Sequence, residues 1–220
     1  MRLRFIFILA LLVMSTVGAN GQVKKLYPVD EAAKDPTFFV FRVRLLKAIQ
    51  EKDTQFIYSI LDDKIQNDFG GGVGIASFKT TWHAERPNST LWSELLKVIS
   101  LGGHFDEKDH SFSAPYLFGG FPEDVDEFEH GAIIEDGVRV RKEPSTRGEV
   151  LATLSFDIIE VPTWDPQKST NDKREWLLVK LADGQKGYVA AEYVRSPIDY
   201  RAIFEKKNGK WMMTAFIAGD

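Results

Sequence analysis

Apolar residues recur every three or four positions in the first half of the chain, which is the spacing of one face of a helix. The first such run predicts a helix over about residues 36–51, with Asp53 as the cap of a short second helix carrying Ile60 and Leu61. A third helix is expected after the glycines at 70–74, and a fourth over about 89–101. Phe105 and Phe112 then flank a polar hairpin tip. The N-terminal half is therefore predicted to be rich in helix.

The pattern changes after residue 131 to short apolar segments separated by turn residues. Val138 and Val140 alternate with Arg139 and Arg141, as in a strand with one face buried, and Asp183-Gly184 is typical of a tight hairpin turn. The segments with these features are 132–134, 138–141, 149–155, 158–164, 176–181 and 186–190. They predict a small β-barrel of about five to six strands.

Residues 200–217 form a last predicted hairpin around the turn Asn208-Gly209. The pairs expected across that turn are Phe204 with Met213 and Ala202 with Ala215. Both faces of this hairpin are apolar, and a two-stranded hairpin is marginal by itself in water. We therefore expect it to pack on the helices of the first half. The predicted fold is α+β, with a helix-rich N-terminal domain completed by the C-terminal hairpin and the small barrel inserted between them.

Six segments follow from these patterns. In chain order they are a signal peptide (1–19), a leader held only loosely (20–35), the helix-rich N-terminal domain (36–118), an acidic linker (119–131), the barrel (132–196) and the C-terminal hairpin (197–220). The first segment carries Arg2 and Arg4 before the apolar run Phe5 to Met14, which is shorter than the roughly 20 residues of a membrane-spanning helix. The prediction is an exported, periplasmic or extracellular protein without stable membrane insertion after cleavage.

Composition narrows the function further. The chain has 28 basic and 32 acidic residues, so nucleic acid is not an expected partner. It has no cysteine, which excludes disulfides and thiol nucleophiles. It also lacks Ser-x-x-Lys, Gly-x-Ser-x-Gly and His-Glu-x-x-His motifs. These observations favour a protein that is not an enzyme and has no cofactor.

His104 and His110 are the only metal-ligand candidates that the sequence suggests. They bracket three carboxylates, Asp106, Glu107 and Asp109, so a hairpin can bring imidazole and carboxylate together as zinc ligands. Their spacing matches no strong metal signature, and histidines in a polar turn are more often solvated. No metal site is therefore predicted.

The barrel segment carries a recognisable signature. Its parts are Val138-Arg139-Val140-Arg141-Lys142-Glu143-Pro144-Ser145, the strand Trp176 to Leu181, Gly187-Tyr188-Val189 and Tyr193-Val194. Over residues 132–196 this resembles a bacterial Src homology 3 (SH3-like) domain. The sequence departs from the family at Arg139, where asparagine is commonest, and in the long connection 162–175. The resemblance implies a module of the cell envelope that binds peptidoglycan or a peptide segment through an aromatic groove.

Carried over by position, the ligand-binding residues that the resemblance implies are Trp164, Trp176, Tyr188 and Tyr193. An aromatic face offers large contact area at small ordering cost. Trp176, Tyr188 and Tyr193 are also interpretable as core or core-rim residues, since buried aromatics are common. Trp164 lies in a polar loop, where binding and rim packing are both open.

A second resemblance concerns the rest of the chain. Leu45-Leu46-Lys47-Ala48-Ile49, Asp53, Ile60-Leu61-Asp62-Asp63 and Gly209-Lys210-Trp211 are similar to the cystatin-like cone of the nuclear-transport-factor-2 superfamily, in which helices pack on a curved sheet and often enclose a pocket. The helix at 89–101 and the glycine run depart from that pattern.

The predicted function is that of an exported, non-catalytic binding protein of the cell envelope, with peptidoglycan or an envelope protein or peptide as partner. The alternative is a cell-wall hydrolase or small-ligand-binding protein with a pocket in the N-terminal domain, near Trp82, His83 and Glu85 or the glycines at 70–74. A scaffold that binds another envelope protein through the barrel is a third interpretation.

Overall fold

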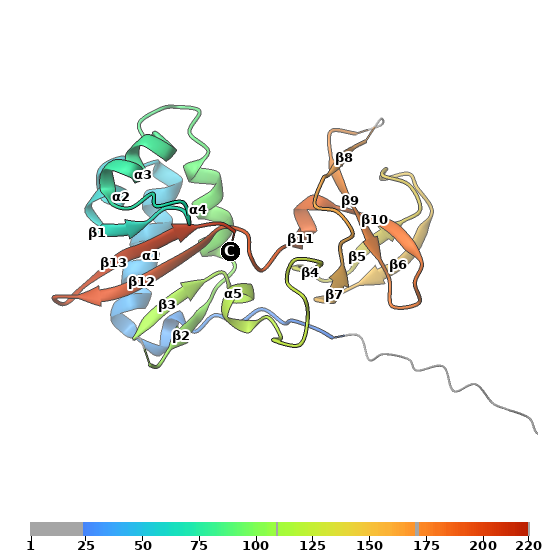
Figure 1. Cartoon of the computed structure of the whole chain (residues 1–220), viewed down its shortest axis with the longest axis horizontal. Helices are drawn as coiled ribbons and strands as arrows, with labels where there is room; N and C mark the ends of the chain where they lie inside the picture. The colour runs from blue at the N-terminus through green and yellow to red at the C-terminus, as the bar shows by residue number, and fades with distance from the viewer. Residues whose placement is uncertain (1–23, 109, 170–171, 220) are drawn as a thin grey trace, which may run out of the picture.

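The computed structural model describes residues 24–108, 110–169 and 172–219. It is mixed α+β and contains two sheets, which lie at opposite ends of the molecule (Figure 1). The predicted signal peptide falls outside the described residues. Within the described ranges, no helix combines the length and the apolar character that a membrane crossing requires.

The first sheet has five strands in the order β1-β13-β12-β3-β2. Its strands are β1 (Leu61–Gln66), β2 (His104–Asp106), β3 (Ser111–Ala114), β12 (Arg201–Lys207) and β13 (Lys210–Ile217). The helices of this half are η1 (Ala32–Lys34), α1 (Pro36–Glu51), α2 (Thr54–Ser59), α3 (Ile75–Trp82), α4 (Leu91–Ser100) and α5 (Tyr116–Gly120). The C-terminal hairpin thus supplies the middle strands of a sheet whose other strands come from the first half of the chain.

Helix α1 has the bounds that its apolar spacing predicts, and its ends show why. The Asp35 carboxylate accepts hydrogen bonds from the backbone N–H groups of Thr37 and Phe38 at 2.7 and 3.2 Å, and Pro36 occupies the first turn. Lys52 ends the helix in a left-handed conformation with φ of 54°. These caps position one apolar face of α1 against the sheet.

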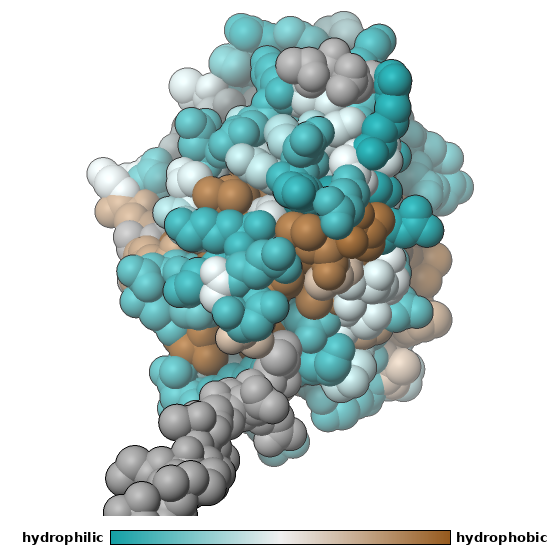
Figure 2. All heavy atoms as spheres, turned by 90° about the vertical axis from the view of Figure 1, so that its right-hand side faces the viewer, coloured by the Kyte–Doolittle hydropathy of each residue, from teal (hydrophilic) through white to brown (hydrophobic). Residues whose placement is uncertain are grey.

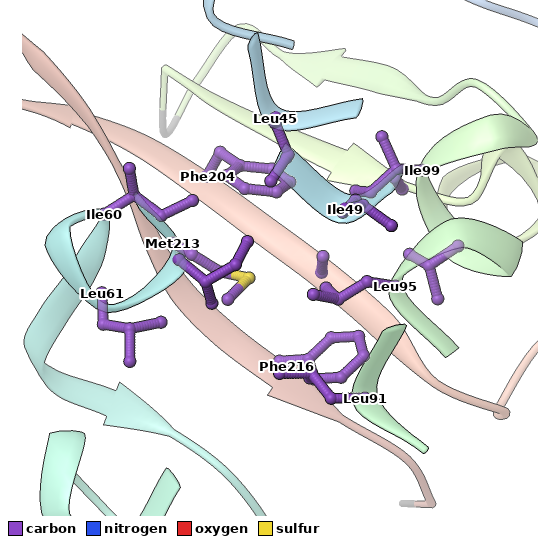
Figure 3. Close-up of a cluster of buried hydrophobic side chains, with 14 of the residues drawn as sticks. Leu45, Ile49, Ile60, Leu61, Leu91, Leu95, Ile99, Phe204, Met213 and Phe216 are labelled. Atoms are coloured by element: carbon purple, nitrogen blue, oxygen red, sulfur yellow. The ribbon is translucent and has the colours of Figure 1, made fainter. Parts of the chain in front are cut away.

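The main core lies between helices α1 and α4 and the strands of the C-terminal hairpin. Figure 3 shows Leu45 and Ile49 of α1, Leu95 and Ile99 of α4, and Phe204 of β12 pointing toward one another. All five side chains are buried. The apolar faces predicted for the two helices therefore pack against the C-terminal hairpin, as expected for a hairpin that is apolar on both faces.

The register of the hairpin agrees with the prediction near the turn and departs from it farther away. Phe204 lies opposite Met213 as expected, but Ala202 lies opposite Phe216 instead of Ala215. The register shifts between Ile203 and Phe204, so Thr214 is an extra residue in β13. Such a bulge changes which side chains face the core, because side chains otherwise alternate along a strand. The prediction for Ala202 was wrong for this reason.

The second sheet contains β4 (His130–Ile133), β5 (Val138–Arg141), β6 (Val150–Leu154), β7 (Ile158–Glu160), β8 (Gln167–Lys168), β9 (Glu175–Lys180), β10 (Lys186–Ala190) and β11 (Val194–Arg195), with the short helix η2 (Ala191–Tyr193) before β11. Its main order is β11-β4-β7-β9-β10-β5-β6. Among the described residues no ladder joins β6 to β11 or to β7, so the predicted barrel is not closed. A cavity of about 770 Å³ lies between β6 and β7, lined by Leu154, Ile159 and Leu181.

The leader is more firmly held than predicted. The backbone N–H of Leu26 donates to the Phe156 carbonyl at 2.8 Å, and the N–H of Ile158 donates to the Lys24 carbonyl at 2.9 Å. Farther along, Asp30 forms a parallel bridge with Gly103. Residues 24–30 therefore connect the edge of the second sheet to the first half of the chain. The loose leader was a wrong interpretation, because its partners are distant in sequence.

A small third core joins the two sheets. Its buried members are Leu26, Tyr116, Leu117, Ala132 and Ile158, which come from the leader, α5 and the second sheet. The Tyr116 hydroxyl is buried and has no hydrogen-bond partner among the described residues. Burial, with a smaller contribution from the Glu135 carboxylate, raises the pKa of Tyr116 to about 12.

This pKa predicts a loss of stability at alkaline pH that the variant Tyr116→Phe lacks. An unfolded tyrosine loses its proton near pH 10, so between about pH 10 and 12 the unfolded state binds fewer protons than the folded state and the free energy of unfolding falls. Urea unfolding at about pH 7 and about pH 11 should show a smaller fall for Tyr116→Phe than for the natural chain. Equal losses in the two proteins would contradict the assignment.

Candidate ligand-binding groove

A groove of about 370 Å³ crosses the second sheet between the β5–β6 turn and the start of β9. We call it the Trp176 groove. Its side-chain walls come from Glu135, Asp136, Val138, Arg139, Arg141, Thr146, Arg174, Trp176, Ala190 and Tyr193. It therefore combines an aromatic floor with several guanidinium groups.

Trp176 forms the buried part of the groove. The β9–β10 ladder places it opposite Ala190, and its side chain is only 2% exposed. Its indole Nε1 is buried and makes no hydrogen bond of ordinary geometry to the protein. The indole still interacts with the Asp172 carboxyl, whose pKa it helps to lower.

The cationic wall is held by contacts from both sides of the groove. Arg141 Nη1 donates to the Gly148 carbonyl at 2.8 Å, which fixes the β5–β6 turn, whereas Arg139 extends into solvent from the same strand. Arg174 Nη1 lies 2.9 Å from Glu192 Oε1. A hydrogen bond to the Tyr193 hydroxyl and the Glu192 carboxylate both raise the pKa of Arg174. The Arg174 guanidinium therefore keeps its positive charge at any physiological pH.

Asp172 lies beside Thr146, which lines the groove. Desolvation alone would raise the pKa of its carboxyl, but hydrogen bonds from the backbone N–H groups of Arg174 and Thr146 outweigh that effect, and the pKa lies below its ordinary value. The Thr146 hydroxyl also lies 3.2 Å from Asp172 Oδ2. This contact ties the β5–β6 turn to the segment that precedes β9.

Two of the four aromatic residues predicted for the site meet in this groove, Trp176 and Tyr193. Tyr188 is half-buried in β10, opposite Arg141 of β5 and Leu178 of β9, and does not line the groove. Trp164 lies elsewhere. Its Nε1 donates to the Phe128 carbonyl at 3.0 Å, and its ring packs so closely on Gly131 that a Cβ there would approach Cη2 to 2.6 Å. Rim packing therefore accounts for the position of Trp164.

The groove also contains residues that sequence reasoning did not assign to it, above all Arg139 and Arg174. The signal for Arg139 was its departure from the asparagine that is commonest in the family that this segment resembles. Arg174 lies in a long polar connection without periodicity, so nothing local indicated its direction.

The two histidines considered as metal ligands lie in different surroundings. The His104 ring packs on α5, where a Cβ on Gly120 would come within 3.0 Å of Nε2. His110 lies in the turn before β3 with φ of 51°. Nowhere in the described ranges do three or more histidine or carboxylate side chains gather in a way that could hold a metal ion.

The region of the alternative site is occupied by structural contacts. Trp82 is buried against Tyr200 and Phe216, with ring centroids 5.1 Å from each. Glu85 accepts a hydrogen bond from the Tyr58 hydroxyl at 3.0 Å. In the glycine run, the N–H of Gly72 donates to Asp68 Oδ1 at 2.8 Å. No observation here favours a pocket over packing.

Comparison with known proteins bears on the second sheet. A family model described as the bacterial SH3 domain matches residues 136–195, which include the whole cationic wall and the floor of the Trp176 groove. Residues 136–195 form a bacterial SH3 domain. The resemblance inferred from the strand and turn motifs is thereby confirmed for this part of the chain.

The SH3 match covers a minority of the chain. The similarity to a named protein is also confined to a short segment. The chain is 35% identical over 63 residues to the teichoic acids export ATP-binding protein TagH of Bacillus cereus. The matched residues make up 28% of this chain and 11% of that protein. The chain thus spans about a tenth of that relative's length. No solved structure matches. The resemblance of the remainder to the nuclear-transport-factor-2 superfamily stays a prediction.

Proposed function

We propose that this chain is an exported, non-catalytic binding protein of the bacterial cell envelope, and that its SH3 domain binds peptidoglycan or a peptide segment in the Trp176 groove. The observation that carries the proposal is the groove itself, in which the buried Trp176 forms the floor of a cavity walled by Arg139 and Arg174. Domains of the matched family commonly bind cell-wall material, which supports the choice of ligand.

The chemistry of the groove suits a peptide. Peptides present carboxylates and backbone carbonyls, which accept hydrogen bonds from guanidinium and indole N–H groups, and charge-assisted bonds of this kind are the stronger ones. The Tyr193 ring adds apolar contact area beside them. The face of the molecule at the end that carries the second sheet is mostly hydrophilic, with separate hydrophobic patches (Figure 2). This favours recognition in a defined groove over broad apolar adhesion.

Export and domain layout complete the proposal. The signal-peptide pattern of residues 1–19 fits a protein that works outside the cytoplasm. We propose that residues 132–196 are inserted between two parts of one N-terminal domain, since β3 precedes them, β12 follows them, and the two strands pair. The first domain would then serve as a rigid mount for the SH3 domain.

The proposal predicts that Arg139→Glu weakens binding to purified bacterial sacculi about tenfold, because a charge-assisted hydrogen bond is replaced by repulsion of a ligand carboxylate. The mature chain from residue 20 is mixed with sacculi, the sacculi are pelleted, and the bound fraction is measured against concentration. Arg44→Glu is the matched control, since Arg44 is exposed on α1 and its replacement changes the net charge equally.

Two outcomes would overturn the proposed function. One is natural protein that stays in the supernatant at every concentration. The other is an Arg139→Glu variant that pellets as well as the natural chain and the Arg44→Glu control. A hydrolytic activity, seen as release of soluble fragments from the sacculi, would contradict the non-catalytic part.

A further inference from the structure

A second cavity lies beside the Trp176 groove. It has a volume of about 710 Å³, and both cavities are lined by Glu135 and Arg174. The far wall of the second cavity is helix α4, through Lys97, Ser100 and the following Leu101. The two cavities are therefore neighbours, and the second one reaches from the SH3 domain to a helix of the N-terminal half.

The two walls of the second cavity are held in a fixed relation. Arg195 at the end of the SH3 domain is 6% exposed, and its Nη2 donates to the Tyr200 carbonyl at 2.6 Å, just before β12 begins. Its Nη1 also lies 3.5 Å from Asp199 Oδ2. The small third core and the leader add further contacts between the SH3 domain and the N-terminal half. A site built across both parts can thus be preorganised, which lowers the cost of binding.

The charges along the second cavity indicate the class of ligand. Its lining contains cations and carboxylates in equal number: Lys97, Lys173, Arg174 and Arg195 against Glu135, Glu175, Glu192 and Asp199. A polyanion would meet as many like charges as opposite ones, and so would a polycation. Arg174 pairs with Glu192 and Arg195 with Asp199 inside the protein. A chain that carries both amino and carboxylate groups can place each beside its opposite among the remaining four, Lys97, Lys173, Glu135 and Glu175.

We propose that the two cavities form one composite groove that binds an extended peptide bearing both amino and carboxylate groups, with α4 as one wall. This inference rests on the proposed function and names its ligand class. The volumes leave room for such a ligand, since the cavities of 710 Å³ and 370 Å³ each lie within the range of about 300–1,000 Å³ that small-molecule sites occupy.

The test blocks the groove from the side of α4. Ser100→Trp is expected to weaken binding of the mature chain to sacculi about tenfold, because the indole fills the space beside Lys97. Ser93→Trp is the matched control. Both serines are exposed on α4 and each donates to the carbonyl three residues earlier, but only Ser100 lines the cavity. Lys97→Glu tests the same wall by charge if the larger side chain disturbs folding.

The ligand class is tested by competition with three synthetic octapeptides, in which glycine alternates with lysine and glutamate in turn, with lysine alone, or with glutamate alone. The mixed peptide is expected to displace the protein from sacculi at a concentration about fivefold lower than either of the others. Better competition by the glutamate peptide would replace the inference with binding of a polyanion, and better competition by the lysine peptide would likewise overturn it.

The outcomes separate the two proposals. If Arg139→Glu loses binding while Ser100→Trp and Lys97→Glu bind like the Ser93→Trp control, the composite groove is wrong and the SH3 site stands. If the natural chain does not bind sacculi at all, both fail together.

Discussion

A mature chain that stops at Ser196 is expected to lose the fold of its N-terminal half. Strands β12 and β13 lie in the middle of the first sheet, where β12 pairs with β3 and β13 with β1. The buried apolar side chains that the truncation removes are Ala202, Phe204, Trp211, Met213, Ala215, Phe216 and Ile217. At about 1.5–3 kcal/mol for each large one, the loss is roughly 10 kcal/mol, comparable with the whole stability of an ordinary domain.

Thermal unfolding followed by circular dichroism measures this effect. The truncated chain should show no cooperative transition from its N-terminal half, while any signal from the SH3 domain survives. A control variant with two alanines in place of Asn208 and Gly209 at the exposed hairpin turn keeps the buried strands and should lower the melting temperature only modestly. A truncated chain that melts as high as the full mature protein would show that the hairpin is dispensable.

Phe38→Ala is expected to destabilise the protein by about 3–5 kcal/mol, the second largest effect. Phe38 is 0% exposed and its ring lies within 4.2 Å, centroid to centroid, of Phe112 and 4.8 Å of Trp211. These partners come from β3 and β13, so the ring joins α1 to two strands that are distant in sequence. Its removal leaves a cavity that the surrounding rings can fill only in part.

The neighbouring residue provides the control. Phe39 follows Phe38 on the same helix but is 47% exposed, so Phe39→Ala should change the free energy of unfolding by about 0.5 kcal/mol or less. Urea unfolding of the two variants at the same pH gives the comparison. Similar losses for both would contradict burial in the aromatic core as the reason, since alanine has the higher helix propensity and that difference alone would stabilise both variants.

Helix α1 and the hairpin turn show how much of the fold local sequence can predict. The spacing of apolar residues and the capping pattern placed the helix at residues 36–51, as found. Strand β1 shows the limit. Ile60 and Leu61 were expected to continue the short second helix, but α2 ends at Ser59 and β1 begins at Leu61. Pairing with β13, on the far side of the SH3 domain in sequence, overrides the weak helical preference there.

The candidate site also contains residues that the sequence predicted and residues that it did not. The SH3 motifs pointed to Trp176 and Tyr193, because alternation and the closing motif are local features of strands β9 to β11. The opposing wall, with Arg139 and Arg174, and the extension along Lys97 of α4 were not indicated. When a groove lies between separate elements, the hydrophobic periodicity of each element does not show which residues of the others it faces.

The sequence by itself determined that this protein has an SH3 domain, a helix-rich first half and an apolar C-terminal hairpin, since periodicity, caps and turn residues act over a few neighbouring positions. Only the tertiary structure decided that the barrel ladder stays open, that the leader pairs beside Asp157, that Thr214 shifts the hairpin register, and that α4 lines the cavity beside the Trp176 groove. These features depend on contacts between residues far apart in the chain, where the free energy of packing, and not local preference, selects the arrangement.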